Sequence, residues 1–248
     1  MSAPRSTGTR LCLIYGYSLP EGAVPVEGER VTVKVAGGKE VEATDGADVV
    51  AIPRHGFDRS IPAHRVDHKS NIRAACKLGC DRVIALGSAG SLDEDLEVGT
   101  LIAPEDFYAT EVAPSFYRDA RGHSVPGFDM GWRRVVISAW DSLAPTRLED
   151  GGVYAQTLGP RFETPAEVRA LGEFADMVGM TIAAEAVLAG EADLAYAAVC
   201  TIDNLANGVR GKALTVEEYE RGRDRTAEVL RECLGYVLPA LAKELPRA

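Results

Sequence analysis

The chain has 248 residues, of which 46% are hydrophobic and 26% are charged, and its formal net charge is −10. This length and composition fit one large globular domain or two small ones, with a core that needs no disulfide or metal to hold it. The negative charge argues against a general affinity for nucleic acid or membrane surfaces, because the average field repels both. A small anionic substrate would therefore need a local group of cationic side chains.

The cysteine pattern indicates buried, reduced thiols. There are five cysteines, an odd number, and no two of them have CxxC spacing. Cys76 and Cys80 are one helical turn apart, but no histidine or second cysteine pair completes a zinc site. The first ten residues lack an apolar signal core, and no apolar run is long enough to span a bilayer. We therefore expect a soluble, cytoplasmic protein.

In chain order, the first elements are strands. Residues 11–15 predict a short buried strand, and alternating polarity around Gly37-Gly38 predicts a hairpin. Residues 47–53 predict another buried strand, and residues 68–80 have the spacing of an amphipathic helix. A strand is expected at residues 82–86, followed by a loop of small residues.

The second half continues the alternation of strands and helices. The expected elements are a strand-like segment at 98–110, a helix at 131–143, a strand–turn–helix at 151–174, a helix at 183–192, a buried strand at 194–202 and a long helix at 215–245. Two helix starts carry capping signals, namely Thr164 with Pro165 and Glu167, and Thr215 with Glu218. The pattern predicts one α/β domain over residues 1–248, with helices packed on a central sheet.

Four loops follow predicted buried strands, and such loops meet at the ligand-binding edge of an open α/β sheet. They read "GYSLP", "PRHGF", "GSAGSL" and "DNLANG". In the third loop, Gly87 and Ala89 would let backbone N–H groups approach an anion, and Ser88 adds a hydroxyl. Arg54 could bind phosphate through two parallel hydrogen bonds, and Ser18 could supply a further donor. The alternative for the third loop is a tight strand–helix turn.

Three histidines lie close together in the sequence. His55 directly follows Arg54, and His64 and His68 are one helical turn apart. No carboxylate motif accompanies them, so we predict no metal site. Packed or solvent-exposed histidines are the alternative to a functional role.

Two later segments offer groups that can read a planar ring. Phe162 provides an aromatic face, and Glu163 is a carboxylate that can accept from ring N–H groups. Asn204 carries a donor and an acceptor, so it can bridge a ring nitrogen and an adjacent oxo group. Met180 could lie under an apolar ring. The alternatives are core positions for Phe162 and Met180, a solvated Glu163, and an Asx turn at Asp203 and Asn204.

Together these segments resemble one family. The motifs "PRHG", "IPAHRV", "VIALGSAGSL", "GPRFETPAEVR", "GMTIAAEAVLAGEADLAYA" and "DNLANG" resemble the trimeric purine nucleoside phosphorylase and methylthioadenosine phosphorylase family. The resemblance covers roughly Leu11 to Gly208. It implies a single α/β domain around a mixed, partly barrel-like sheet flanked by helices. It also implies a homotrimer or a dimer of trimers, with sites near the subunit interfaces.

The reaction that this resemblance implies is phosphorolysis. Phosphate attacks C1′ of a purine nucleoside and releases the base and ribose 1-phosphate, without a metal or organic cofactor. The protein must position phosphate and stabilise both an oxocarbenium-like sugar and a departing purine.

The resemblance assigns roles to residues of this chain. Phosphate would be bound by Ser18, Arg54, His55, Gly87, Ser88 and Ala89. Base and ribose would contact Phe162, Glu163, Met180, Thr181, Asn204 and His64. The catalytic residues would be Asn204, His55 and Asp203. Asn204 would donate to purine N7 as negative charge develops there.

The base-reading pair predicts the substrate class. Family members that take 6-aminopurines carry an aspartate where Asn204 stands, and Glu163 would accept from the N1–H that hypoxanthine and guanine have and adenine lacks. A mismatch in such a buried site costs about 1–3 kcal/mol. We therefore expect a 6-oxopurine nucleoside phosphorylase acting on inosine or guanosine.

The chain also departs from the family. Tyr17 adds bulk beside Ser18, Gly87 replaces a polar residue, and Asp203 stands where threonine is common. The 5′ group of the substrate therefore stays open, and a phosphorylase of methylthioinosine or methylthioadenosine is the alternative. A nucleoside hydrolase and a nucleoside-binding module without turnover also stay open.

Overall fold

The structure, a computed structural model, describes residues 3–6, 8–20 and 22–244, which fold around one mixed β-sheet. Its strands are β1 (Arg10–Tyr15), β2 (Glu29–Lys34), β3 (Glu40–Asp45), β4 (Val49–Pro53), β5 (Cys80–Ser91), β6 (Leu101–Ala103), β7 (Asp106–Tyr108), β8 (Leu148–Asp150), β9 (Val153–Gln156), β10 (Met177–Gly179) and β11 (Ala195–Leu205). The α-helices are α1 (His68–Lys77), α2 (Met130–Leu143), α3 (Pro165–Leu171), α4 (Ile182–Glu191) and α5 (Val216–Leu241). Short 3₁₀ helices are η1 (Ala63–Arg65), η2 (Ala120–Gly122) and η3 (Val209–Gly211).

The centre of the sheet is parallel. Strands β4, β1, β5 and β11 lie side by side in that order and run in the same direction. The hairpin β2–β3 extends the sheet beyond β4, and two branches leave from the other side. One branch continues from β5 through β10 and β9 to β7, and the other from β11 through β6 to β8. The predicted mixed α/β sheet is confirmed.

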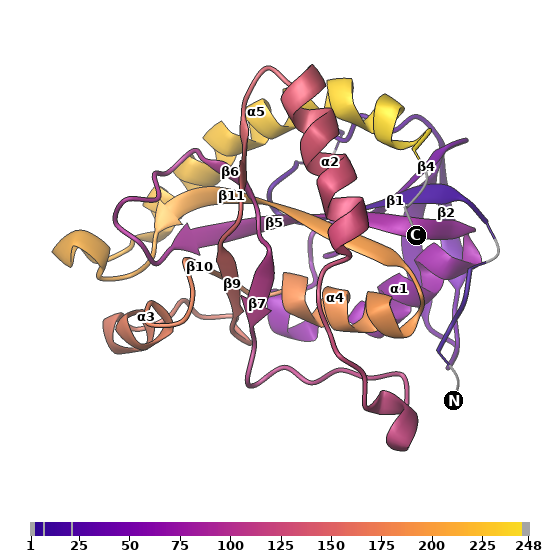
Figure 1. The fold of residues 1–248 in the computed structure, drawn as a ribbon, viewed down its shortest axis with the longest axis horizontal. Helices are drawn as coiled ribbons and strands as arrows, with labels where there is room; N and C mark the ends of the chain where they lie inside the picture. The colour runs from indigo at the N-terminus through magenta and orange to yellow at the C-terminus, as the bar shows by residue number, and fades with distance from the viewer. Residues whose placement is uncertain (1–2, 7, 21, 245–248) are drawn as a thin grey trace.

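Helices cover both faces of this sheet, with α2 and α5 on one face and α1 and α4 on the other (Figure 1). Side chains alternate accordingly along β1. Leu11 and Leu13 belong to the cluster that contains Trp132 of α2 and Leu234 of α5. Ile14 belongs to the opposite cluster with residues of α1 and α4. The period-two pattern of a strand thus supplies apolar side chains to two cores at once.

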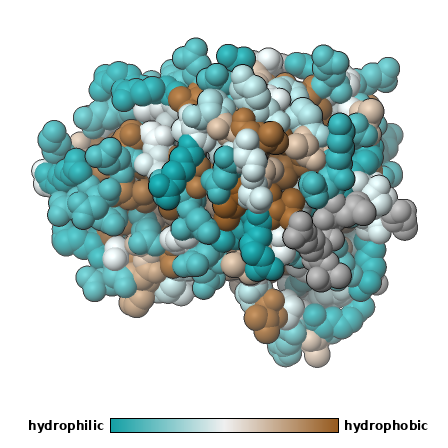
Figure 2. All heavy atoms as spheres, turned by 45° about the horizontal axis from the view of Figure 1, so that its top comes forward, coloured by the Kyte–Doolittle hydropathy of each residue, from teal (hydrophilic) through white to brown (hydrophobic). Residues whose placement is uncertain are grey.

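Figure 2 shows mainly hydrophilic side chains over the face that it presents, with hydrophobic ones gathered near its centre. All five cysteines are buried and unpaired. Within the described ranges, no helix combines the length and apolarity that crossing a membrane requires.

The structure confirms the predicted hairpin turn and the two predicted helix caps. The hairpin turns at Gly37 and Gly38, whose φ angles are 84° and 70° and therefore suit glycine. Thr164 and Thr215 both form complete capping boxes at the starts of α3 and α5. The predicted segment 98–110 divides into β6 and β7 on either side of Pro104, which lacks a backbone donor.

The prediction of a loop at residues 87–92 is wrong. Strand β5 continues to Ser91, and Gly87, Ser88 and Ala89 pair with β11. The reason is packing, because a Cβ on Gly87 would lie 3.0 Å from Ile182 Cγ1 and 3.1 Å from the sulfur of Cys200. Small residues here let α4 approach the sheet, and their backbone pairs with β11 on one side.

The ends of other elements also differ. Strand β11 runs through Asp203 and Asn204 to Leu205, where a loop was expected. The short strands β8 and β10 were not predicted, since three residues carry too little periodicity. Helix α5 ends at Leu241, and Leu245, the expected end, lies outside the described residues.

Helix α5 contacts β11 closely at one glycine, and this contact yields a stability prediction. A Cβ on Gly222 would lie 1.6 Å from the carbonyl oxygen of Asp203, whereas a Cβ on Gly235 of the same helix would meet nothing within 4 Å. We expect Gly222→Ala to lower the free energy of unfolding by about 3 kcal/mol or more, because α5 must move away from the sheet. Gly235→Ala should raise it by up to about 1 kcal/mol. Urea unfolding of both variants measures this, and equal effects would contradict the close contact.

Candidate active site

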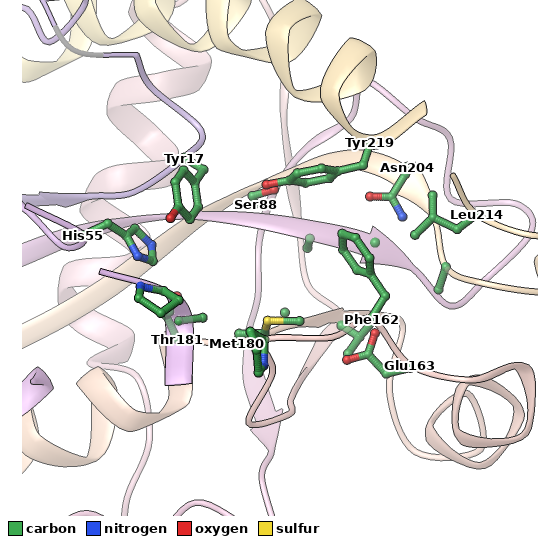
Figure 3. A pocket seen from close by; sticks show the side chains of 18 of the residues that line it. Tyr17, His55, Ser88, Phe162, Glu163, Met180, Thr181, Asn204, Leu214 and Tyr219 are labelled. Carbon is green, nitrogen blue, oxygen red and sulfur yellow. The ribbon is translucent and has the colours of Figure 1, made fainter. Parts of the chain in front are cut away.

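A cavity of about 260 Å³ lies where β1 and β4 end and where β5 and β11 approach their carboxyl ends. The turn before α4 forms its floor, and the first turns of α5 complete the wall (Figure 3). Parallel strands place all of these segments at one edge of the sheet. The structure therefore brings together segments that are far apart in the sequence.

Most of the predicted site residues line this one cavity. They are Arg54, His55, Ser88, Ala89, Phe162, Glu163, Met180, Thr181 and Asn204. The other predicted residues, Ser18, His64, Gly87 and Asp203, do not line it. The wall also contains residues that sequence reasoning did not assign, among them Tyr17, Gly90, Leu214 and Tyr219.

His55 lies at one end of the cavity as a neutral acceptor. Its Nδ1 is 2.7 Å from the carbonyl oxygen of Ile61, so Nδ1 carries the proton and donates it there. Burial, followed by the nearby Arg54 charge, lowers the pKa of His55 to about 4. The other ring nitrogen, Nε2, is consequently unprotonated at neutral pH.

Tyr17 holds the ring of His55. The two rings stack with centroids 4.2 Å apart and an angle of 24° between their planes. Arg59 supports the stack, because its guanidinium donates to the carbonyl oxygens of Tyr17 and Leu19 and lies 5.2 Å from the Tyr17 ring. Aromatic stacking of this kind restricts ring rotation. The loops after β1 and β4 are thereby joined at the cavity.

The Nε/Nη2 edge of the Arg54 guanidinium forms a bidentate ion pair. Its Nε and Nη2 donate to the two carboxylate oxygens of Glu185 at 2.5 and 2.9 Å, and Nη1 donates to the carbonyl oxygen of Leu86. Tyr196 and His68 also contact the Glu185 carboxylate. Burial opposes the ionisation of both partners, but their mutual attraction keeps the pKa of Glu185 low and that of Arg54 high. The cation expected for phosphate is therefore already balanced by a carboxylate.

Ser88 belongs to a chain of hydroxyl groups that leads to a buried carboxylate. Its Oγ donates to one oxygen of Asp203, and Thr226 of α5 donates to the other. The Tyr219 hydroxyl also reaches Ser88. Burial raises the pKa of Asp203, and the two hydroxyl donors partly oppose this shift. Asp203 thus lies behind Ser88, although sequence reasoning had placed it among the catalytic residues.

The opposite end of the cavity has the groups expected for a planar base. Phe162 and Tyr219 meet edge to face with centroids 5.3 Å apart. Glu163 is buried, and its Oε1 accepts from the Thr157 hydroxyl at 2.6 Å. Asn204 donates one amide hydrogen to the carbonyl oxygen of Leu205, which leaves its second hydrogen for another acceptor.

The remaining predicted residues have other surroundings. Ser18 is fully buried, and its hydroxyl has no hydrogen-bond partner among the described residues. His64 is exposed on η1, while its neighbours Pro62 and Ala63 reach the cavity wall. Gly87 is packed under α4. The expected phosphate loop therefore contributes Tyr17, the residue next to Ser18, to the cavity.

Tyr17 and Tyr219 were missed for different reasons. Tyr17 was visible as an unusual residue beside the predicted phosphate donor. Tyr219 lies at a polar turn of a long helix, and no local pattern distinguishes it from its exposed neighbours. Among the residues that the structure describes, no three histidine, cysteine, aspartate or glutamate side chains are grouped to hold a metal ion.

A family model described as the phosphorylase superfamily matches residues 15–238. The chain belongs to this superfamily. A "Probable 6-oxopurine nucleoside phosphorylase" from Archaeoglobus fulgidus is 39% identical to this phosphorylase, with 82% of this chain and 83% of the relative covered. The "6-oxopurine nucleoside phosphorylase" of Pyrococcus furiosus is 34% identical, with 89% of each chain covered. A "Probable S-methyl-5′-thioinosine phosphorylase" from Methanopyrus kandleri is 35% identical, with 77% and 78% covered.

Solved structures confirm the fold of this phosphorylase. Methylthioadenosine phosphorylase from Schistosoma mansoni, in complex with adenine, superposes with a TM-score of 0.81 at 22% identity. The match covers 95% of this chain and 93% of that one. The family and the fold class expected from the sequence motifs are both confirmed.

The buried His55 makes the stability of this phosphorylase depend on pH. Its pKa is about 4 in the folded protein and near 6.5 ordinarily, so between these values the unfolded chain binds a proton that the folded protein does not. Stability should be complete above pH 6.5 and fall by up to about 1.4 kcal/mol per pH unit as the pH drops toward 4. Urea unfolding at a series of pH values measures the slope. His55→Gln should remove it, whereas His123→Gln, a change at an exposed histidine, should keep it.

Proposed function

We propose that this protein is a 6-oxopurine nucleoside phosphorylase, which cleaves inosine or guanosine with inorganic phosphate and releases the base and ribose 1-phosphate. One observation carries the proposal, namely that a single cavity has His55 and Arg54 at one end and Glu163 and Asn204 at the other. The relatives from Archaeoglobus fulgidus and Pyrococcus furiosus bear this activity in their names. No metal or organic cofactor enters the proposed reaction.

The base end has the polarity that a 6-oxopurine needs. Glu163 offers its second carboxylate oxygen to the N1–H of hypoxanthine or guanine, since its first accepts from Thr157. Asn204 offers its remaining amide hydrogen to purine N7 or O6. Phe162 provides an aromatic face for the ring, and Met180 lies toward the sugar between the two ends (Figure 3).

The proposed chemistry needs few protein groups because phosphate is the nucleophile. Phosphate held beside His55 and the unpaired N–H groups of Arg54 attacks C1′ as the bond to the base breaks. The donor on Asn204 strengthens its hydrogen bond as negative charge develops on the purine. In this proposal the cavity holds both reaction partners in line.

A second candidate substrate is 5′-methylthioinosine. Relatives named for that activity match this chain at similar identity, such as the one from Methanopyrus kandleri. The apolar side chain of Leu214 and the ring of Tyr219 lie on the wall of the same cavity. Trimer formation and a cytoplasmic location stay predictions from the sequence.

The first experiment measures base release from inosine with and without phosphate. We expect hypoxanthine and ribose 1-phosphate in phosphate buffer, and a rate at least roughly 100-fold lower without phosphate, because the cavity must hold the nucleophile in place. Methylthioinosine, assayed in parallel, decides the 5′ preference. An equal rate in phosphate-free buffer would indicate a hydrolase, and binding of inosine without base release would indicate a binding module.

The second experiment changes the base-reading amide. Asn204→Asp should shift the ratio of kcat/KM for inosine over adenosine toward adenosine by roughly 10- to 100-fold, because a carboxylate accepts from an amino group. Asn204→Ala is the control, since it should weaken the reaction with both substrates without reversing the preference. An unchanged ratio in Asn204→Asp would show that this residue does not read position 6 of the purine.

A further inference from the structure

At the phosphate end of the cavity, two polar side-chain atoms present lone pairs, beside the two N–H hydrogens of Arg54 that Glu185 and Leu86 leave unpaired. His55 has committed its one proton to the carbonyl oxygen of Ile61, so Nε2 presents a lone pair. Ser88 has committed its hydroxyl proton to the Asp203 carboxylate, so its Oγ also presents lone pairs. Both residues line the cavity that contains the proposed phosphate site, and Figure 3 shows them on either side of Tyr17.

The charges around this end of the cavity also disfavour a fully deprotonated oxyanion. The positive charge of Arg54 is matched by Glu185, to which it donates twice. The Asp203 carboxylate, behind Ser88, adds a further negative charge. The formal sum of these three groups is negative when all are ionised. A fully deprotonated oxyanion would therefore face both repulsion from carboxylates and lone pairs that it cannot satisfy.

We propose that Asp203, by taking the proton of Ser88, makes this end of the cavity select an oxyanion that carries its own proton. This inference rests on the proposed phosphorylase function and names the form of its co-substrate. Phosphate and arsenate keep at least one proton at neutral pH and can donate it to His55 Nε2 or Ser88 Oγ. Sulfate has the same shape but keeps no proton, so it leaves both acceptors unpaired.

Asp203 acts in this arrangement as a positioning residue. Its two carboxylate oxygens accept from Ser88 of β5 and Thr226 of α5, so it fixes the direction of the Ser88 hydroxyl. Because Gly222 packs against the Asp203 carbonyl, α5 holds this part of β11 in place. These hydrogen bonds satisfy a carboxylate that lies at a position with little access to solvent.

The test compares phosphate with sulfate on the whole chain. Isothermal titration calorimetry with each ion, at one neutral pH and matched ionic strength, should show phosphate binding roughly tenfold or more tightly than sulfate. Ser88→Ala removes an acceptor, so phosphate affinity should fall roughly fivefold while sulfate affinity stays the same. Asp203→Ala frees the Ser88 proton and removes a negative charge, so sulfate affinity should rise. Thermal melting checks that each variant folds.

Thr226→Val is the matched control. It removes another donor to Asp203 but leaves the Ser88 hydrogen bond, so the ratio of phosphate to sulfate affinity should remain that of the unmodified protein. Phosphate and sulfate have the same shape, so the ratio of their affinities reports on proton donation by the ion. A structural defect of the site would weaken the binding of both ions and leave this ratio unchanged.

Some outcomes overturn the inference and leave the proposed function intact. Inosine phosphorolysis together with equal affinity for phosphate and sulfate would do so, as would an unchanged affinity ratio in a folded Ser88→Ala protein. Failure to bind phosphate, with no phosphate-dependent cleavage of inosine, would overturn the proposed function as well.

Discussion

The buried ion pair between Arg54 and Glu185 is the interaction on which the site depends. It joins the turn after β4 to the first turns of α4, two segments 131 residues apart in the sequence. Neither charge is stable alone in this interior, because removal of one partner leaves an uncompensated buried charge. Tyr196 and His68 complete the hydrogen bonding of the carboxylate. The pair therefore fixes the sheet edge against α4, and the turn before this helix forms the floor of the cavity.

Around this pair, the described residues that line the cavity offer an anion no cation without a carboxylate partner. His55 is neutral and Arg54 is balanced, so the anion must be held by oriented hydrogen bonds more than by net charge. Such preorganised dipoles favour a geometry in which the nucleophile meets the sugar. The base end also relies on oriented hydrogen bonds. Glu163 uses one carboxylate oxygen and Asn204 one amide hydrogen within the protein, and each keeps a second one for a ligand.

Much of the site was visible in the sequence because strand ends are local features. Arg54 and His55 follow a buried strand, and Phe162 with Glu163 precedes a helix start marked by Thr164. Residues at the end of a strand must lie at the sheet edge, so the positions of Arg54 and His55 followed from the pattern. Phe162 and Glu163 were assigned to the base through the family resemblance. The hydrogen bond from Ser88 to Asp203 could not be predicted from the position of a strand end. The surroundings of Ser88 depend on the pairing of β5 with β11 and on the packing of α5.

The resemblance of the chain's motifs to a known family supplied residues of the cavity wall such as His55, Glu163 and Asn204. The sequence by itself determined the alternation of strands and helices, the hairpin at Gly37 and Gly38 and both capping boxes. These features depend on period, turn chemistry and short-range hydrogen bonds, which act within a few residues. Only the tertiary structure decided that Gly87 packs under a helix, that Asp203 takes the Ser88 proton and that Glu185 balances Arg54. Each of these joins segments that no local pattern relates, because burial and charge pairing are set by neighbours in space.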